Sequence, residues 1–331
     1  MNCIELFWRH FSKYRSAVMG IAMLSIMLSH QRFLHGLPWN VFEVYGHWGV
    51  DIFLFLSGMG MVRSLSIHPI REFYFRRFKR LVPICIFCGA LKYFIFLIVG
   101  EPIRNLEVGL HIGFLSVFSL DLWFIYSIVI YYLLSPLLFR VLKSHSLLIM
   151  FLVYVLSIGM QHFFAEKVGY EWLNPLGIIL YTAERLPVFM VGMLTSMYSS
   201  KIAKKHFLFS TCAFLVAVAL SVLLKVHLLV ADLFVLVYPL LSVSILAIVS
   251  FVISMFMHLP KWGLSLFDFV GRHSLEVYLV HEFIFGALLL TSYTKANHWF
   301  LLMISFVLSF MAAWACRWCT DKLMMFFPYT R

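Results

Sequence analysis

The chain alternates between long apolar runs and short polar segments over most of its length. A helix needs about 20 mostly apolar residues to cross the hydrocarbon core of a membrane. By that rule the pattern predicts ten membrane-spanning helices. They lie near residues 16–34, 45–65, 81–99, 122–142, 146–164, 176–198, 207–224, 233–257, 273–293 and 298–318. One further apolar segment, 109–120, is too short to cross and is predicted to be re-entrant or interfacial.

Composition supports a membrane location. Of the 331 residues 63% are hydrophobic and only 12% are charged, and the mean hydropathy is +0.93. A soluble fold of this length has too little interior to hide so much apolar surface, so lipid must be the solvent for most of the chain. The sequence shows no internal repeat and no stretch typical of a soluble domain. We therefore expect an all-α, polytopic protein with a single integral-membrane domain over residues 1–331.

The net charge of +11 would suggest nucleic-acid binding in a soluble protein. In a membrane protein, basic residues gather in the cytoplasmic loops. With ten spans and both termini in the cytoplasm, 19 of the 26 lysines and arginines fall in cytoplasmic segments. If 109–120 also crossed, the basic clusters at 140–143 and 201–205 would move outside. The charges thus predict a multi-pass protein of the cytoplasmic (inner) membrane that contacts lipid and no nucleic acid.

Several charged or titratable residues interrupt the predicted spans, where a charge near the bilayer centre costs about 2.5–3.5 kcal/mol on insertion scales. Asp51 lies near the outer start of one span, and Glu184 and Arg185 are adjacent in another. The latter two form either a structural ion pair between helices or part of a functional pathway, and the residues alone leave both open. Glu276 and His281 are five apart, so we expect them to face different neighbours.

The first apolar run ends in "SIMLSHQRFLHG", with His30 where the helix should leave the bilayer. Such a histidine is either an interfacial residue or a reactive group. Two further motifs, Cys85-x-x-Cys88 and Cys316-x-x-Cys319, lie in or beside apolar segments and have no histidine at zinc-finger spacing. We interpret these cysteines as packing residues and predict no metal.

The stretch "FYFRRFKRLVP" carries the strongest local signal. On a helix, Arg77 and Arg80 are i, i+3 neighbours and Arg76 and Arg80 are i, i+4 neighbours, so all three side chains can converge on one ligand. Forked guanidinium donors suit phosphate oxygens. The alternative is an ordinary cytoplasmic anchor for the next span.

Six motifs occur in an order that resembles acyltransferase family 3, the integral-membrane acyltransferases. They are "MGIAMLSIMLSH", "GVDIFLFLSG", "FYFRRFKRLVP", "DLWFIYSIVIYYLLSPLL", "ERLPVFMVGM" and "HSLEVYLVHEF", between about residues 15 and 285. Each is weak alone, but six in order are specific. The resemblance implies a ten-helix core and transfer of an acyl group, usually acetyl from cytoplasmic acetyl-CoA, to a hydroxyl of a glycan or lipid-linked sugar.

The resemblance also implies roles for particular residues. His30 matches the family's histidine at the end of the first helix, Asp51 the acidic residue of the second helix, and Arg77 and Arg80 the Arg-x-x-Arg pair. His281 matches the histidine of "YLVH". The predicted catalytic residues are His30 and Asp51. Trp123, Glu184 and Arg185, which lie in the matching motifs, and His281 are the predicted substrate-binding or supporting residues. The predicted donor-binding residues are Arg77 and Arg80, together with Arg76, which helical spacing places beside Arg80, and Arg15.

One position departs from the family pattern. Met19 stands where the family usually has a basic residue, eleven positions before the histidine. Arg15 is one helical turn earlier on the same face and reaches toward the same space. From Arg15 to His30 a helix rises about 22 Å at 1.5 Å per residue. A donor held at the inner face must therefore extend a long arm toward His30.

These residue types fit acyl transfer. A sugar hydroxyl is a poor nucleophile at neutral pH, so its attack on a thioester needs a base such as histidine. Asp51 would orient His30 and stabilise its imidazolium. Direct transfer is preferred over an acyl-histidine intermediate, which stays open. The rival interpretation is a transporter or flippase with Asp51, Glu184, Arg185 and His281 in an intramembrane pathway. It leaves the Arg76–Arg80 cluster unexplained.

Overall fold

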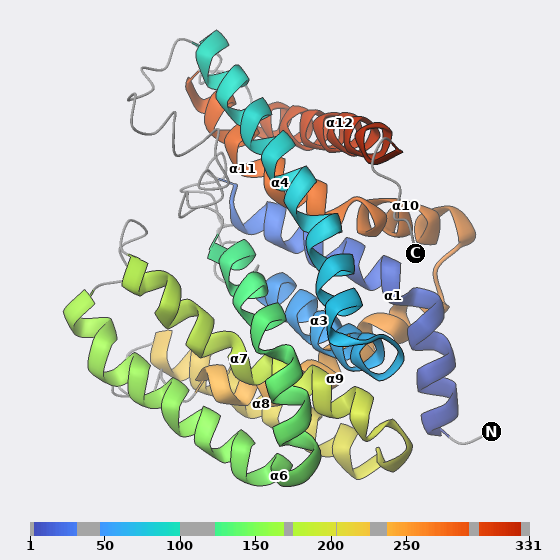
Figure 1. Ribbon diagram of the computed structural model, residues 1–331, viewed down its shortest axis with the longest axis vertical. Coiled ribbons are helices and arrows are strands. Elements are labelled where there is room, and N and C mark those ends of the chain that lie inside the picture. The colour runs from blue at the N-terminus through green and yellow to red at the C-terminus, as the bar shows by residue number, and fades with distance from the viewer. Residues whose placement is uncertain are drawn as a thin grey trace. The chain divides into compact units, whose positions relative to one another are not determined.

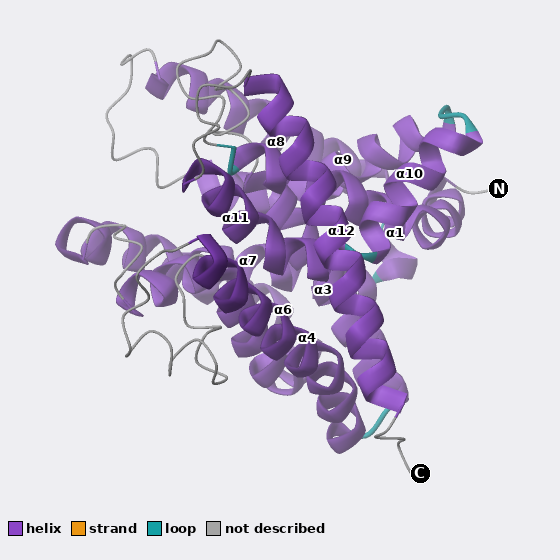
Figure 2. Ribbon diagram, turned by 90° about the horizontal axis from the view of Figure 1, so that it is seen from above, coloured by secondary structure: helices purple, strands orange, loops and turns teal. Residues whose placement is uncertain are grey.

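The computed structural model describes residues 3–31, 47–99, 123–168, 175–202, 204–225, 237–290 and 298–325. Within these residues the chain is all helix with short turns and no strand (Figure 2). The predicted all-α fold class is confirmed. The short apolar segment at 109–120 lies outside the described residues.

The helices follow the predicted apolar runs closely (Figure 1). In chain order they are α1 (Cys3–Ser29), α3 (His47–Ile67), α4 (Ile70–Val99), α6 (Trp123–Val168), α7 (Pro175–Met197), the 3₁₀ helix η5 (Ser199–Lys201), α8 (Lys204–Lys225), α9 (Val237–Met257), α10 (Lys261–Arg272), α11 (Ser274–Leu290) and α12 (His298–Met325). Each of the ten predicted spans coincides with one of these helices or with part of one.

Helix α6 contains two of the predicted spans. It bends sharply (Figure 1) at His145, whose φ of −136° and ψ of 48° are not helical. His145 lies between the predicted spans 122–142 and 146–164, in the polar stretch "KSHS" that separates their apolar runs. The two apolar runs are therefore joined by a tight polar corner rather than by a loop.

Five helices in the described residues are long and apolar enough to cross a membrane. They contain Trp48–Ile67, Trp123–Gln161, Ile178–Met197, Leu240–Met257 and Trp299–Met325. The second half of α6 leaves large apolar side chains exposed, among them Leu147, Phe151 and Val155, and such a surface is stable only against lipid. The protein is therefore a multi-pass membrane protein. The total of ten spans stays a prediction.

One helix, α10, was not predicted. Its 12 residues rise only about 18 Å, too little to span a membrane, and charged Lys261, Asp268 and Arg272 interrupt its apolar positions. A search for membrane-length apolar runs passes over such a helix. Its side chains are sorted by face: Val270 is buried, whereas Trp262 and Leu266 are exposed.

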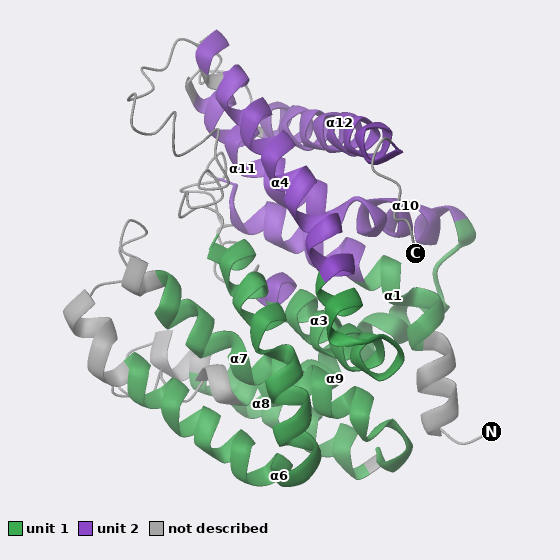
Figure 3. Ribbon diagram, in the orientation of Figure 1, with its two compact units in different colours: residues 1–18, 51–74, 123–261 green, residues 19–50, 75–122, 262–331 purple. Residues whose placement is uncertain are grey.

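The chain forms two compact units that are interleaved along the sequence (Figure 3). Unit 1 comprises residues 1–18, 51–74 and 123–261, and unit 2 comprises residues 19–50, 75–122 and 262–331. Helices α1, α3, α4 and α10 each contribute residues to both units. The prediction of a single functional domain over 1–331 stays a prediction.

In unit 1, helices α3 and α7 meet backbone to backbone. A Cβ atom added at Gly58 would overlap the carbonyl oxygen of Phe189, and one added at Gly192 would overlap that of Phe55. Small residues at such a crossing let membrane helices approach closely enough for side chains on either side to pair. Seven residues before each glycine lie Asp51 and Arg185, and these two side chains are in contact. The crossing of residues 55–58 with residues 189–192 comes after the contact of Asp51 with Arg185 on both helices, so α3 and α7 run parallel.

Candidate active site

Unit 2 brings the two predicted histidines together. His30 follows the last turn of α1, where its backbone N–H donates to the carbonyl of Ile26 at 3.2 Å. His281 lies in the middle of α11 and is 1% exposed. The His30 Nδ1 and His281 Nε2 atoms are 2.7 Å apart, which is a short hydrogen bond. The ring planes differ by 9° and the ring centroids are 5.0 Å apart.

His281 is fixed on its other side by its own helix. Its Nδ1 atom lies 2.8 Å from the carbonyl oxygen of Tyr278 and 3.1 Å from that of Val277. The rings of Tyr278 and Phe285 lie 5.7 Å and 5.5 Å from the imidazole. Hydrogen bonds at both nitrogens and aromatic contacts at the sides leave this ring little freedom. His30 is therefore paired with a rigid partner.

Unit 1 brings together Asp51, Glu184 and Arg185, three of the charged residues of the predicted spans. Arg185 Nη1 contacts Asp51 Oδ1 at 2.6 Å, and Arg185 Nε lies 3.4 Å from Glu184 Oε1. All three side chains are at most 6% exposed. The guanidinium carbon of Arg185 also lies 5.9 Å from the centre of the Trp123 ring. Of the two alternatives left open for Glu184 and Arg185, the structure contains an ion pair between helices, with Asp51 of α3 as the carboxylate that contacts Arg185 of α7. A functional role for these residues is not tested.

Hydrogen bonds between α6 and α7 hold this charged cluster in place. The Ser127 and Thr182 hydroxyls are 2.7 Å apart, and the Tyr131 hydroxyl donates to the Thr182 carbonyl at 2.6 Å. The Trp123 ring stacks on Tyr181 with centroids 5.2 Å apart. These contacts lie within one turn of Arg185, so α6 positions the helix segment that carries it.

The predicted donor-binding arginines lie where the helical pattern requires. Arg76, Arg77 and Arg80 are all within the continuous helix α4; Arg76 and Arg80 are exposed, and Arg77 is half-buried. In unit 1, Arg15 is exposed on α1, and its Nη2 would lie 3.8 Å from a Cβ added at Gly60. The i, i+3 and i, i+4 spacings are therefore realised. Binding of a ligand by these residues stays a prediction.

The predicted partnership of Asp51 with His30 also stays a prediction. The contacts the structure gives are Asp51 with Arg185 and His30 with His281. The expectation that Glu276 and His281 face different neighbours agrees with the structure, because Glu276 contacts Arg317 of α12.

Sequence reasoning missed two groups. Gln31, directly after His30, is fully buried, and neither polar atom of its side chain has a hydrogen-bond partner among the residues that the structure describes. A buried amide without a partner is costly and marks a place where a ligand can bind. Its position beside a candidate base was the available signal.

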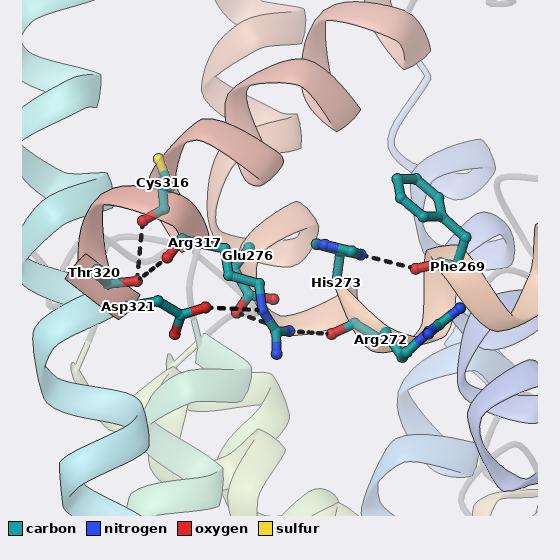
Figure 4. A network of polar contacts seen from close by, with 8 residues as sticks. All are labelled: Phe269, Arg272, His273, Glu276, Cys316, Arg317, Thr320 and Asp321. Carbon is teal, nitrogen blue, oxygen red and sulfur yellow. Dashed lines mark hydrogen bonds and ion pairs between the residues drawn. The ribbon is translucent and has the colours of Figure 1, made fainter. Parts of the chain in front are cut away.

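The second missed group joins three helices of unit 2 (Figure 4). Arg317 of α12 donates to the carbonyl of Arg272 at the end of α10 at 2.6 Å. It also lies 3.6 Å from the carboxylates of Glu276 on α11 and Asp321 on α12. Arg317 thus fixes the corner between α10 and α11 against α12, which is a structural role.

The cysteines behave as packing residues where the structure describes them. Cys85, Cys88 and Cys316 are buried free thiols, and Cys319 is half-buried. No group of three or more histidine, cysteine or acidic side chains within the described ranges is arranged to hold a metal ion. The prediction that the reaction uses no metal is not tested by this finding.

A comparison with protein families decides the class of the protein. The Acyl_transf_3 family, described as an acyltransferase domain, matches residues 17–318, nearly the whole chain. The chain belongs to this acyltransferase family. The resemblance deduced from six short motifs is thereby confirmed, and the protein is a membrane acyltransferase. Searches of curated proteins and of solved structures gave no match.

The matched region contains His30, His281 and three of the four candidate arginines, Arg76, Arg77 and Arg80. Arg15 lies two residues before it. The pair of half-buried His30 and buried His281 places an imidazole, a group that can take up a proton near neutral pH, against a rigid polar partner at the end of α1.

Proposed function

We propose that this acyltransferase moves an acyl group, acetyl in the first instance, from cytoplasmic acetyl-CoA to a hydroxyl of a glycan or lipid-linked sugar. His30 is the general base. The observation that carries the proposal is the hydrogen bond between His30 and His281, which holds an imidazole in a defined orientation at the end of the first helix. Family membership supplies the reaction class.

The chemistry is a direct transfer. His30 accepts the proton of the acceptor hydroxyl as its oxygen attacks the thioester carbonyl. The carbon–sulfur bond then breaks, and the proton on His30 passes to the coenzyme A thiolate. An imidazole suits both steps because its unperturbed pKa of about 6.5 lies close to the working pH. Asp51 is proposed to support the charge that develops on His30.

The donor is proposed to be bound through its phosphates. Arg76, Arg77 and Arg80 on α4 present guanidinium groups at i, i+3 and i, i+4 spacing, which matches a cluster of phosphate oxygens. Arg15 is proposed to assist from α1. In the proposed orientation both termini lie in the cytoplasm and the protein resides in the inner membrane, so that cytoplasmic acetyl-CoA reaches these arginines.

Trp123, Glu184 and Arg185 are proposed to support the acceptor side. Asp51 and Glu184 flank Arg185 as counter-ions, so the charges of this cluster are paired with one another. A transport pathway would instead need charged groups that are not paired. Together with the family match, this pairing argues against the transporter or flippase interpretation.

The test is transfer of labelled acetyl groups from acetyl-CoA to candidate glycans by the purified protein in lipid nanodiscs. His30→Gln keeps the size and hydrogen bonding of the side chain but cannot take up a proton at neutral pH. We expect it to fold and to bind acetyl-CoA as the parent does, and to lose about 10²–10⁴-fold in transfer rate. A His30→Gln protein that keeps more than about a tenth of the parent rate would contradict His30 as the base.

A further inference from the structure

We propose that His281 is a positioning residue that holds His30 in the tautomer with its proton on Nδ1, so that Nε2 of His30 is the atom that takes the acceptor's proton. This inference rests on the proposed function of His30. It is drawn from the direction of three hydrogen bonds in unit 2, which the chemistry of their partners fixes.

The Nδ1 atom of His281 is a hydrogen-bond donor. Its two neighbours are the carbonyl oxygens of Val277 and Tyr278, at 3.1 Å and 2.8 Å. Carbonyl oxygens accept hydrogen bonds and never donate them, so Nδ1 of His281 carries a hydrogen. A ring that is 1% exposed is favoured in its neutral form, because burial disfavours charge. A neutral imidazole has one N–H, and Nε2 of His281 is therefore an acceptor.

The contact between the two rings fixes the position of the hydrogen on His30. Nε2 of His281 lies 2.7 Å from Nδ1 of His30, and an acceptor at that distance requires a donor. Nδ1 of His30 therefore carries the hydrogen, and the lone pair of neutral His30 is on Nε2. The backbone of α11 thus sets the tautomer of His30 through one intervening ring. In free histidine the opposite tautomer, with the proton on Nε2, is the more populated one.

The hydrogen bond between the two rings also supports the proton transfer. When Nε2 of His30 takes the acceptor's proton, the ring becomes an imidazolium, and its Nδ1–H bond to His281 becomes charge-assisted and stronger. His281 thus shares, as a neutral ring, the task that the acid beside a catalytic histidine performs in hydrolases. A neutral partner suits a helix interior where a carboxylate would need its own counter-ion. Both nitrogens of His281 are occupied, so this ring is a poor candidate for the base itself.

The experiment compares two substitutions at residue 281. In His281→Gln, the amide oxygen can take the place of Nε2 and accept from His30. In His281→Phe, the ring shape is kept and the acceptor is lost. We expect His281→Phe to lower kcat about 10–100-fold, by analogy with the cost of losing the partner that orients a metal-bound histidine, with an unchanged KM for acetyl-CoA. We expect His281→Gln to restore most of that loss.

A spectroscopic measurement tests the tautomer directly. ¹⁵N-histidine labelling in nanodiscs distinguishes protonated from unprotonated ring nitrogens, and the His30 signals are assigned from their absence in His30→Gln. The parent should show a protonated Nδ1 and an unprotonated Nε2 at His30, and His281→Phe should shift the population toward Nε2–H. His273→Phe is the matched control, because the ring of His273 lies in the same unit and donates from Nδ1 to the carbonyl of Phe269 at 3.0 Å.

The outcomes separate this inference from the proposed function. An active parent whose His30 carries its proton on Nε2 overturns the inference, without reference to any variant. So does a His281→Phe protein with parental kcat and tautomer. A parent that transfers nothing, or a His30→Gln protein that stays active, contradicts the proposed function instead. If His281→Phe does not fold, the parent spectrum and the rate of His281→Gln still decide.

Discussion

The buried contact between Asp51 and Arg185 makes a sharp energetic prediction. Replacing Arg185 by Gln leaves the carboxylates of Asp51 and Glu184 buried without a cation, since both now lie within 3.4 Å of that guanidinium. Replacing Asp51 by Asn is milder, because Glu184 still neutralises Arg185. We therefore expect Arg185→Gln to destabilise the protein more than Asp51→Asn does.

The magnitude follows from the geometry. At 2.6 Å and an effective dielectric constant of about 20, the attraction between the two charges is about 6 kcal/mol. Most of it offsets the cost of removing both groups from water. Breaking a buried pair from one side typically costs about 3–5 kcal/mol, because an uncompensated charge remains. We expect Arg185→Gln to fall in that range and Asp51→Asn, with Glu184 still in place, to lie below it.

The assay is the free energy of unfolding in mixed micelles, measured by detergent titration and tryptophan fluorescence. A double-mutant cycle with Asp51→Asn and Arg185→Gln isolates the coupling. The double variant should be more stable than Arg185→Gln alone, because it removes one of the two orphaned carboxylates. Asp268→Asn is the matched control, since its pair with Arg272 is exposed and such pairs contribute about 0–1 kcal/mol. Strict additivity of the two single changes would refute the reasoning.

Three further predictions concern the donor, the topology and the unpaired amide. Changing Arg77 or Arg80 to Ala should weaken acetyl-CoA binding by about 1.5–3 kcal/mol, measured by calorimetry. Lys at either position should restore only part of the lost affinity. Unchanged affinity would mean that the arginine cluster is only a membrane anchor. In a cysteine-free background, a cysteine at position 203 should resist an impermeant thiol reagent applied from outside, and labelling would overturn the ten-span arrangement. Gln31→Leu should leave the free energy of unfolding equal or higher, because an unpaired buried amide is removed. If Gln31 binds substrate, the same change should lower the transfer rate in the nanodisc assay, and an unaltered rate would leave it no role.

Much of the helical architecture was predictable because lipid imposes a length and a composition on every crossing segment. The break in α6 at His145 was predictable for the same reason, since polar residues there interrupt an apolar run. Helix α10 was not, because a 12-residue amphipathic helix satisfies no rule written for spans. The family was predictable because its motifs are short and occur in a fixed order, so they can be recognised in a single sequence.

The contacts within the candidate site were harder to predict. His30 and His281 are 251 positions apart, and no local pattern states that their rings meet. Asp51 and Arg185 are 134 positions apart, and the sequence could say only that each needed a partner. The pairing of Asp51 with Arg185 depends on the close approach of α3 and α7 at Gly58 and Gly192. A glycine in an apolar run does not indicate which helix will pack against it.

The parallel course of α3 and α7 has a consequence for how the chain threads the bilayer. Two parallel spans begin on the same side, so the stretch between them must change sides an odd number of times. The predicted spans 81–99, 122–142 and 146–164 provide three such changes. A fourth, by residues 109–120, would turn α7 upside down relative to α3 and separate Asp51 from Arg185. One ion pair buried in unit 1 therefore requires an odd number of membrane crossings between α3 and α7. In the proposed orientation, where α3 ends in the cytoplasm, α7 ends there too, and residues 201–205 are expected on the cytoplasmic side.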